Sequence, residues 1–218
     1  MQMTIDDLKK IVIPDEFGCD DDDYGDVLDE VINQIPCNYA YGVSKFVIFI
    51  NDKEVAKIPF NGQFFWDDES KEYVFENFHN IMDYCALEAD IYEEAVTRGL
   101  EMFFAGTRYV GHTADNTPFY ISERVNKNLD DVWDDVSDEE VATARTYAQT
   151  KEDFSWRRLS DRWLALALRF YGKELVDKFV KFIKDFGIND LHFNNVGVRE
   201  DGSPCLIDYS GWQHEFGF

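Results

Sequence analysis

An α+β fold is predicted by two patterns that occupy different parts of the chain. Between residues 38 and 125, the runs "KFVIFIND", "EVAKIPF", "FFAGTRYVG" and "TPFYISERV" are rich in β-branched and aromatic residues, and a polar turn joins the first two and the last two. Beyond residue 125, apolar residues instead recur at the spacing of helices. We therefore expect a small β-rich part followed by a mainly helical part.

Residues 1–37 are predicted to form a helical extension. Thr4 followed by Asp7 matches the start of a capped helix, and apolar residues recur at helical spacing from Leu28 to Pro36. The acidic run "DEFGCDDDDYGD" lacks the alternating ligands, central glycine and terminal glutamate of a calcium loop. We interpret it as a solvated loop.

The β-rich part is predicted to contain two hairpins with a helix between them. An Asn-Asp turn joins the first two strand-like runs, and "HTADN" joins the last two. The helix is expected over roughly residues 74–98. By period, its inward stripe consists of Ile81, Cys85, Glu88, Tyr92 and Ala95.

Glu88 is the one charged residue on this apolar stripe. A carboxylate there costs several kcal/mol to desolvate unless it is hydrogen-bonded or paired with a cation. Lys57, which lies among apolar residues in "EVAKIPF", is the candidate cation. We predict an ion pair between Lys57 on a strand and Glu88 on the helix.

The second part of the chain shows helix signals in order. Ser137 and Glu140 form a capping-box pattern. Two apolar stripes follow, stopped by Gly172 and Gly187. We interpret both stripes as core packing; they consist of Leu159, Trp163, Leu166 and Phe170, and then of Leu175, Phe179, Phe182 and Phe186.

The stretch "GINDLHFNNVGVREDGSPCLIDYSG" combines polar side chains with a predicted hairpin. Asp190 and Asn195 lie in a loop after the last helix, and the second strand of the hairpin leads to Asp208. Oxygen ligands from an asparagine and an aspartate, with phosphates completing the shell, suit Mg²⁺. Asn195 and Asp208 are therefore predicted to bind Mg²⁺.

The charge of the chain limits its partners. With 44 acidic and 21 basic residues the net charge is -23, so direct binding to nucleic acid is not expected. No apolar run is long enough to span a membrane, and the start of the sequence lacks an apolar signal region. We expect a cytoplasmic protein with reduced cysteines.

These residues together resemble the protein-kinase superfamily. "VAK" resembles the V-A-I-K motif, Glu88 the helix-C glutamate, "NDLHFNN" the catalytic loop and "IDYSG" the D-F-G motif. The wording around "DLHFNNVGV" and "LIDYSG" is similar to that of small phage-encoded and bacterial kinase-like proteins. The resemblance implies a two-lobed kinase-like fold that binds ATP and Mg²⁺, in the host cytoplasm if the chain is phage-encoded.

The resemblance also implies a role for each matching residue. Lys57, held by Glu88, would bind the α- and β-phosphates, Asp190 would orient the hydroxyl that is phosphorylated, and Asn195 and Asp208 would hold Mg²⁺. Gly42 and Ser44 would lie near the phosphates. Ser122 would border the adenine pocket, and the backbone from Glu123 to Val125 would contact adenine.

The implied organisation is an N-lobe over residues 38–122, a hinge over 123–125 and a C-lobe over 126–218. The phosphate-covering turn has one glycine, Gly42, where the family typically has three. The sequence also ends ten residues after Asp208, without an A-P-E motif, so the C-lobe is expected to be short and without the usual peptide-docking helices.

Three functions remain open at this point. The first is an ATP- and Mg²⁺-binding protein that transfers phosphate to itself or to a small substrate. The second is a pseudokinase that regulates a host or cellular protein by binding. The third is an acidic inhibitor that occupies a basic, nucleic-acid-handling protein.

Overall fold

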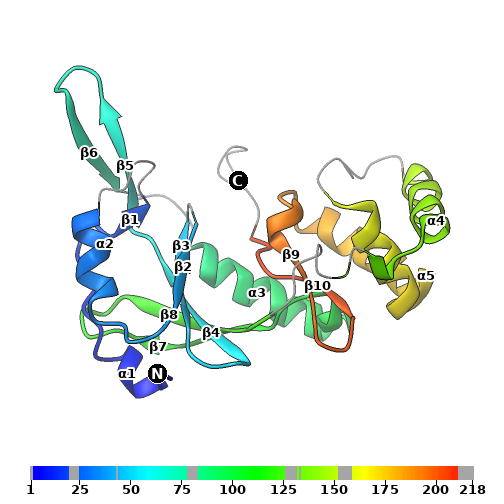
Figure 1. The fold of residues 1–218 in the computed structure, drawn as a ribbon, viewed down its shortest axis with the longest axis horizontal. Helices are drawn as coiled ribbons and strands as arrows, with labels where there is room; N and C mark the ends of the chain where they lie inside the picture. The colour runs from blue at the N-terminus through cyan, green and yellow to red at the C-terminus, as the bar shows by residue number, and fades with distance from the viewer. Residues whose placement is uncertain are drawn as a thin grey trace. The chain divides into compact units, whose positions relative to one another are not determined.

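The computed structural model describes residues 2–19, 25–42, 44–77, 83–125, 132, 134–151 and 159–210. It is a mixed α+β structure, as predicted (Figure 1). The chain divides into two compact units. Unit 1 comprises Met1–Ala89 and Thr107–Arg124, and unit 2 comprises Asp90–Gly106 and Val125–Phe218. No helix in the described part of the chain is long and apolar enough to cross a membrane.

Unit 1 is built on an antiparallel five-stranded sheet with the order β2-β3-β4-β8-β7. Both predicted hairpins are present in this sheet. In the first, the Asn51 side chain closes the turn by accepting from the backbone N–H groups of Lys53 and Glu54. The strands are β2 (Tyr39–Tyr41), β3 (Lys45–Phe49), β4 (Glu54–Pro59), β7 (Thr107–His112) and β8 (Pro118–Glu123).

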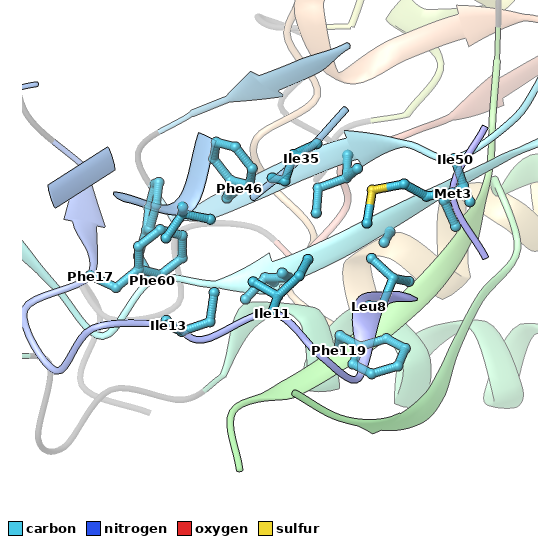
Figure 2. Packing of buried hydrophobic residues seen from close by; sticks show 14 of the residues in the cluster. Met3, Leu8, Ile11, Ile13, Phe17, Ile35, Phe46, Ile50, Phe60 and Phe119 are labelled. Atoms are coloured by element: carbon cyan, nitrogen blue, oxygen red, sulfur yellow. The ribbon is translucent and has the colours of Figure 1, made fainter. Parts of the chain in front are cut away.

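The N-terminal residues cover one face of this sheet. They form α1 (Ile5–Leu8), β1 (Gly18–Cys19) and α2 (Gly25–Ile32), and the predicted capping box of Thr4 and Asp7 is confirmed. Figure 2 shows their apolar side chains packed against the sheet. The cluster includes Met3, Leu8, Ile11, Ile13, Phe17, Ile35, Phe46, Ile50, Phe60 and Phe119.

The prediction of a helix over residues 74–98 is wrong at its start. β5 (Gly62–Asp67) and β6 (Glu72–Asn77) form a hairpin that pairs with β1, and α3 spans Tyr84–Thr97. Residues 78–82, including Ile81, lie outside the described part. The hairpin is favoured by cross-strand pairs of aromatic rings, whose centroids are 4.9 Å apart for Phe64 and Phe75 and 5.2 Å apart for Trp66 and Tyr73.

Unit 2 has an aromatic core around its longest helix. Its elements are η1 (Glu101–Phe103), α4 (Asp138–Gln149), α5 (Asp161–Asp185), η3 (Phe193–Asn195), β9 (Val196–Val198) and β10 (Pro204–Leu206), together with the second part of α3. The Trp163 indole donates to the Cys205 carbonyl over 3.3 Å, which ties α5 to β10. The buried rings of the core are those of Phe103, Phe104, Trp163, Phe179, Phe182 and Tyr209.

Gly172 interrupts α5, as its predicted helix-stopping role requires. Its φ of 76° and ψ of 160° are not helical, so the helix is broken into two segments at this residue. The expectation that Phe170 belongs to the core is wrong, because its side chain is 42% exposed. Phe170 lies just before the break in α5, where the apolar stripe of the first helical segment has ended. Its ring is beside Gly202 in the β9–β10 turn.

The capping box of α4 gives a prediction about pH. Glu140 accepts from the Ser137 N–H over 2.9 Å and from Arg169 Nε over 2.7 Å, and the Arg169 bond is the main cause that lowers its pKa to about 2. Because the carboxylate is favoured in the folded state, this contribution is present above the unfolded pKa, near 4.5, and is lost as the pH falls toward 2.

Glu140→Gln retains a capping side chain but removes the charge. We expect it to lower the melting temperature at pH 7 by about 1–3 °C, since a half-exposed ion pair contributes under about 1 kcal/mol. The difference should shrink as thermal unfolding is measured toward pH 2. Glu139→Gln, in the same helical turn, is the matched control. If the melting temperatures of Glu140→Gln and the parent differ as much near pH 2 as at pH 7, the effect does not come from the charge of Glu140.

Candidate functional site

The N-terminus of α3 is fixed to the sheet of unit 1 by Asp83. One carboxylate oxygen accepts from the backbone N–H groups of Cys85 and Ala86, at 2.8 and 3.0 Å, which caps the helix. The other accepts from the Tyr120 hydroxyl on β8 over 2.8 Å. Burial and this bond raise the pKa of Tyr120. Asp83 therefore sets which face of α3 lies against the sheet.

Glu88 lies just over one turn further along α3 and is fully buried. Its Oε2 atom accepts from the ammonium group of Lys57 on β4, with an N–O distance of 2.5 Å. Lys57 is itself only 4% exposed. The predicted ion pair between strand and helix is thus confirmed. β4 is the third strand of the five-stranded sheet in chain order.

A second lysine binds the same carboxylate. Lys45 Nζ donates to Glu88 Oε1, and its side chain is 4% exposed. Sequence reasoning missed this residue, although strand alternation carries the signal. Phe46 points to the core of unit 1, which turns Lys45 to the opposite face. The register pairs Lys45 with Pro59 and Val47 with Lys57, so the two lysines are diagonal neighbours on that face.

The rest of the predicted α3 stripe is mostly buried as expected. Cys85 and Ala95 are fully buried, and Tyr92 is half-buried. Burial raises the pKa of the Cys85 thiol and so disfavours its thiolate form. Cys37, Cys85 and Cys205 are all free thiols, as expected.

In unit 2, Asp190 and Asn195 are brought together by the loop after α5. Gly187, with a φ of 62°, ends the helix, and buried Ile188 and Leu191 anchor the loop. Asn195 Nδ2 donates to the Asp190 carbonyl over 2.8 Å and to its carboxylate over 3.2 Å. These bonds use the amide nitrogen and leave the amide oxygen as an acceptor, the atom that a hard metal ion requires.

The hairpin β9–β10 brings Asp208 next to Asn195. The backbone N–H groups of Ile207 and Asp208 donate to the Asn195 carbonyl, at 2.9 and 3.5 Å. Two bonds from Arg199, each of 2.8 Å, tie the hairpin to the carbonyls of Met102 and Phe104. These bonds hold the half-buried Asp208 close to the buried Asn195, although their positions in the sequence are thirteen apart.

His192 belongs to the same loop and has a structural role there. Its Nδ1 atom accepts from the Asn194 N–H over 3.1 Å, which caps η3. Its Nε2 atom lies 3.7 Å from the Asp190 carboxylate. His192 thus restrains the loop that carries Asp190.

The other predicted site residues lie at two places. Gly42 and Ser44 flank the β2–β3 turn, at the end of β3 that carries Lys45; the Gly42 N–H donates to the Lys45 carbonyl, and the Ser44 carbonyl accepts from the Phe60 N–H. The second place is the end of β8. There the buried Ser122 accepts from the Thr107 hydroxyl over 3.0 Å.

Two residues of the predicted adenine-binding backbone lie on either side of the unit boundary. Glu123 ends β8 and pairs with Glu54 in unit 1, whereas Val125 belongs to unit 2. Between them, the Arg124 N–H donates to the Lys53 carbonyl over 2.8 Å. That N–H is therefore already used within unit 1.

The donors around Asn195 and Asp208 suit a metal whose shell is completed by phosphate. Among the residues that the structure describes, no group of three or more His, Cys, Asp and Glu side chains could hold a metal by itself. One amide oxygen and one carboxylate fit Mg²⁺, which keeps waters or substrate phosphates as its other ligands.

Comparison with protein-family models, curated proteins and solved structures finds no match for this chain.

Proposed function

We propose that this protein binds ATP with Mg²⁺ and transfers the γ-phosphate, in the manner of a small protein-kinase-like enzyme. The observation that carries the proposal is the buried ion pair of Lys57 and Glu88. A lysine on the third strand paired with a glutamate on the following helix is the arrangement that kinases use to position the α- and β-phosphates. Unit 2 supports it independently through Asp190, Asn195 and Asp208.

Each residue has a role that its position supports. Lys57 would donate to the phosphates while Glu88 fixes its side chain. The Asn195 amide oxygen and the Asp208 carboxylate would hold Mg²⁺, which neutralises charge on the β- and γ-phosphates when bound. Asp190, oriented by Asn195, would accept a hydrogen bond from the attacking hydroxyl or water.

A second candidate, binding to a regulated protein, is favoured by the β5–β6 hairpin. Phe65, Trp66 and Val74 are 41%, 48% and 39% exposed on this hairpin. Exposed apolar side chains gathered on one element are typical of a protein-binding surface. Five acidic residues of the hairpin would favour a basic partner: Asp67, Asp68, Glu69, Glu72 and Glu76.

Thermal unfolding with ATP, in the presence and absence of Mg²⁺, tests the first function. Millimolar ATP binding with a dissociation constant of about 10–100 μM stabilises a protein by roughly 1.4–2.7 kcal/mol. We therefore expect a rise in melting temperature of about 3–10 °C with Mg²⁺ present. No rise with ATP under either condition would contradict the proposal.

Asp208→Asn should remove the Mg²⁺-dependent part of this rise, because a neutral amide replaces the charged ligand. The variant alone should melt close to the parent, since Asp208 is only half-buried. Glu200→Gln, an exposed change in the same hairpin, is the matched control. Unchanged Mg²⁺ dependence in Asp208→Asn would remove this residue from the metal site.

A further inference from the structure

The two faces of the β5–β6 hairpin differ in composition. Neighbouring residues of a strand point to opposite faces, and the register pairs Phe64 with Phe75 and Phe65 with Val74. Four aromatic residues share one face, where their rings contact one another in pairs. The opposite face, which we call the acidic-apolar face, consists of Gln63, Phe65, Asp67, Glu72, Val74 and Glu76.

The acidic-apolar face has an apolar centre and acidic ends. Phe65 and Val74 lie directly opposite each other and are 41% and 39% exposed. Asp67 and Glu72 form the next pair on this face toward the turn, and Glu76 lies at the other end. The two ends are about 13 Å apart, because they are four residues apart along a strand that rises about 3.3 Å per residue.

This face is accessible to a partner along most of its length. Among the described residues, β1 pairs with β5 only at Gly62 and Gln63, and beyond them β5 and β6 continue as a ribbon of two strands (Figure 1). Glu72 and Glu76 are exposed. Lys71, the one basic residue of the hairpin, is 3.1 Å from Asp68 in the turn.

The charge of the hairpin indicates what can cover this face. Residues 62–77 contain five acidic residues and one basic residue, so their net charge is -4. A second copy of the chain would bring the same charge, and a nucleic acid or an anionic membrane would also be repelled. A basic segment of another protein is complementary, since lysine and arginine combine a cationic end with an apolar stem.

We propose that the acidic-apolar face binds a basic segment of a partner protein, with an apolar side chain on Phe65 and Val74 and a cationic side chain at each end. The inference rests on the second candidate function, for which it specifies the partner, and not on ATP binding. In an extended segment, residues i, i+2 and i+4 share one face and span about 13 Å. The expected partner motif is therefore basic at i, apolar at i+2 and basic at i+4.

Fluorescence anisotropy of a labelled seven-residue peptide tests this face on the full chain. The peptide has arginine at its second and sixth positions, leucine at its fourth and threonine elsewhere. Two further peptides replace both arginines by glutamine or the leucine by serine. We expect the parent to bind the first peptide and to bind each of the others about tenfold or more weakly. Binding should also weaken at high salt, which screens exposed charges.

A double variant tests the acidic ends. Glu72→Gln with Glu76→Gln should weaken binding of the first peptide about tenfold or more. Glu93→Gln with Glu139→Gln removes the same charge from exposed positions on α3 and α4. This control should change the affinity less than about twofold. Equal weakening by both double variants would show that the overall charge attracts the peptide, and would overturn the inference.

A second double variant tests the apolar centre. Phe65→Thr with Val74→Thr keeps residues that favour strands and removes the exposed apolar surface. It should weaken the leucine peptide about tenfold or more and should affect the serine peptide little. Circular dichroism shows whether each variant is folded. A leucine peptide that binds this variant as tightly as it binds the parent would remove Phe65 and Val74 from the site.

The outcomes separate this inference from the proposed functions. If both hairpin variants bind the first peptide as the parent does, the protein binds basic segments elsewhere: the second candidate function stands and this face is wrong. If the parent binds none of the peptides, the basic partner and this face are both wrong, whereas stabilisation by ATP still decides the first function. A dimer of the parent that is lost in the Phe65 and Val74 variant, measured by sedimentation, would make a second copy the occupant and would overturn the inference.

Discussion

Glu88→Ala is expected to lower the free energy of unfolding by about 3–5 kcal/mol, because it removes the carboxylate from a buried ionic group and leaves the two cations in place. Here two ammonium groups, those of Lys45 and Lys57, would lose their shared carboxylate. Urea denaturation at neutral pH measures the change. Glu94→Ala, on the same helix, removes a half-exposed ion pair with Arg98 and should cost under about 1 kcal/mol.

A triple variant distinguishes the ionic contribution from packing. Lys45→Met, Lys57→Met and Glu88→Leu together replace the buried ions by apolar side chains of similar size, which is often neutral or stabilising. We expect this variant to recover most of the stability that Glu88→Ala loses, while it no longer binds ATP. A loss below about 1 kcal/mol in Glu88→Ala would contradict the large contribution assigned to this buried carboxylate.

The ion pair of Lys57 and Glu88 could be predicted from the sequence because a buried charge is unstable without a partner. The period of the helix placed Glu88 on an apolar stripe, and a buried carboxylate requires a cation. Lys57 was the nearest candidate with apolar neighbours on both sides. Lys45 was missed because its position depends on the register of β3 against β4, and register is a property of paired strands rather than of one segment.

The start of α3 was predicted wrongly for a related reason. Residues 72–77 contain aromatic and acidic side chains that match a helical period about as well as a strand period. Pairing with β5 decides between them, since Tyr73 and Phe75 contact rings across the hairpin. The left-handed backbone of Lys71, with a φ of 59°, closes the turn. These contacts are not local, so no single segment reveals them.

The proximity of Asn195 and Asp208 could be predicted because a hairpin lies between them. Two short apolar runs separated by "REDGSP" indicate antiparallel strands, and such strands bring their outer ends together. The structure has this hairpin, and the Asp208 N–H lies 3.5 Å from the Asn195 carbonyl. The bonds from Asn195 to Asp190 could not be predicted, because they depend on the conformation of the intervening loop.

If the protein turns over ATP, Asp190→Asn is expected to lower turnover by about two or more orders of magnitude while ATP binds with nearly the parent affinity. The substitution removes the acceptor for the proton of the attacking hydroxyl. It therefore destabilises the transition state and not the complex with ATP. The loop should keep its shape, because Asn195 Nδ2 also donates to the backbone carbonyl of Asp190 over 2.8 Å. That bond does not depend on the side chain at position 190.

Autophosphorylation and slow ATP hydrolysis are the assays for this variant, since no external substrate is assumed. Binding of ATP is measured in parallel by calorimetry, so that a loss of turnover is not confused with a loss of affinity. Asp185→Asn, an exposed change at the end of α5, is the control and should retain parent turnover. Equal turnover in the parent and Asp190→Asn would remove Asp190 from the mechanism. ATP bound without turnover in either protein would instead favour a regulatory protein that uses the nucleotide as a ligand, because the binding groups would then be present without the chemistry.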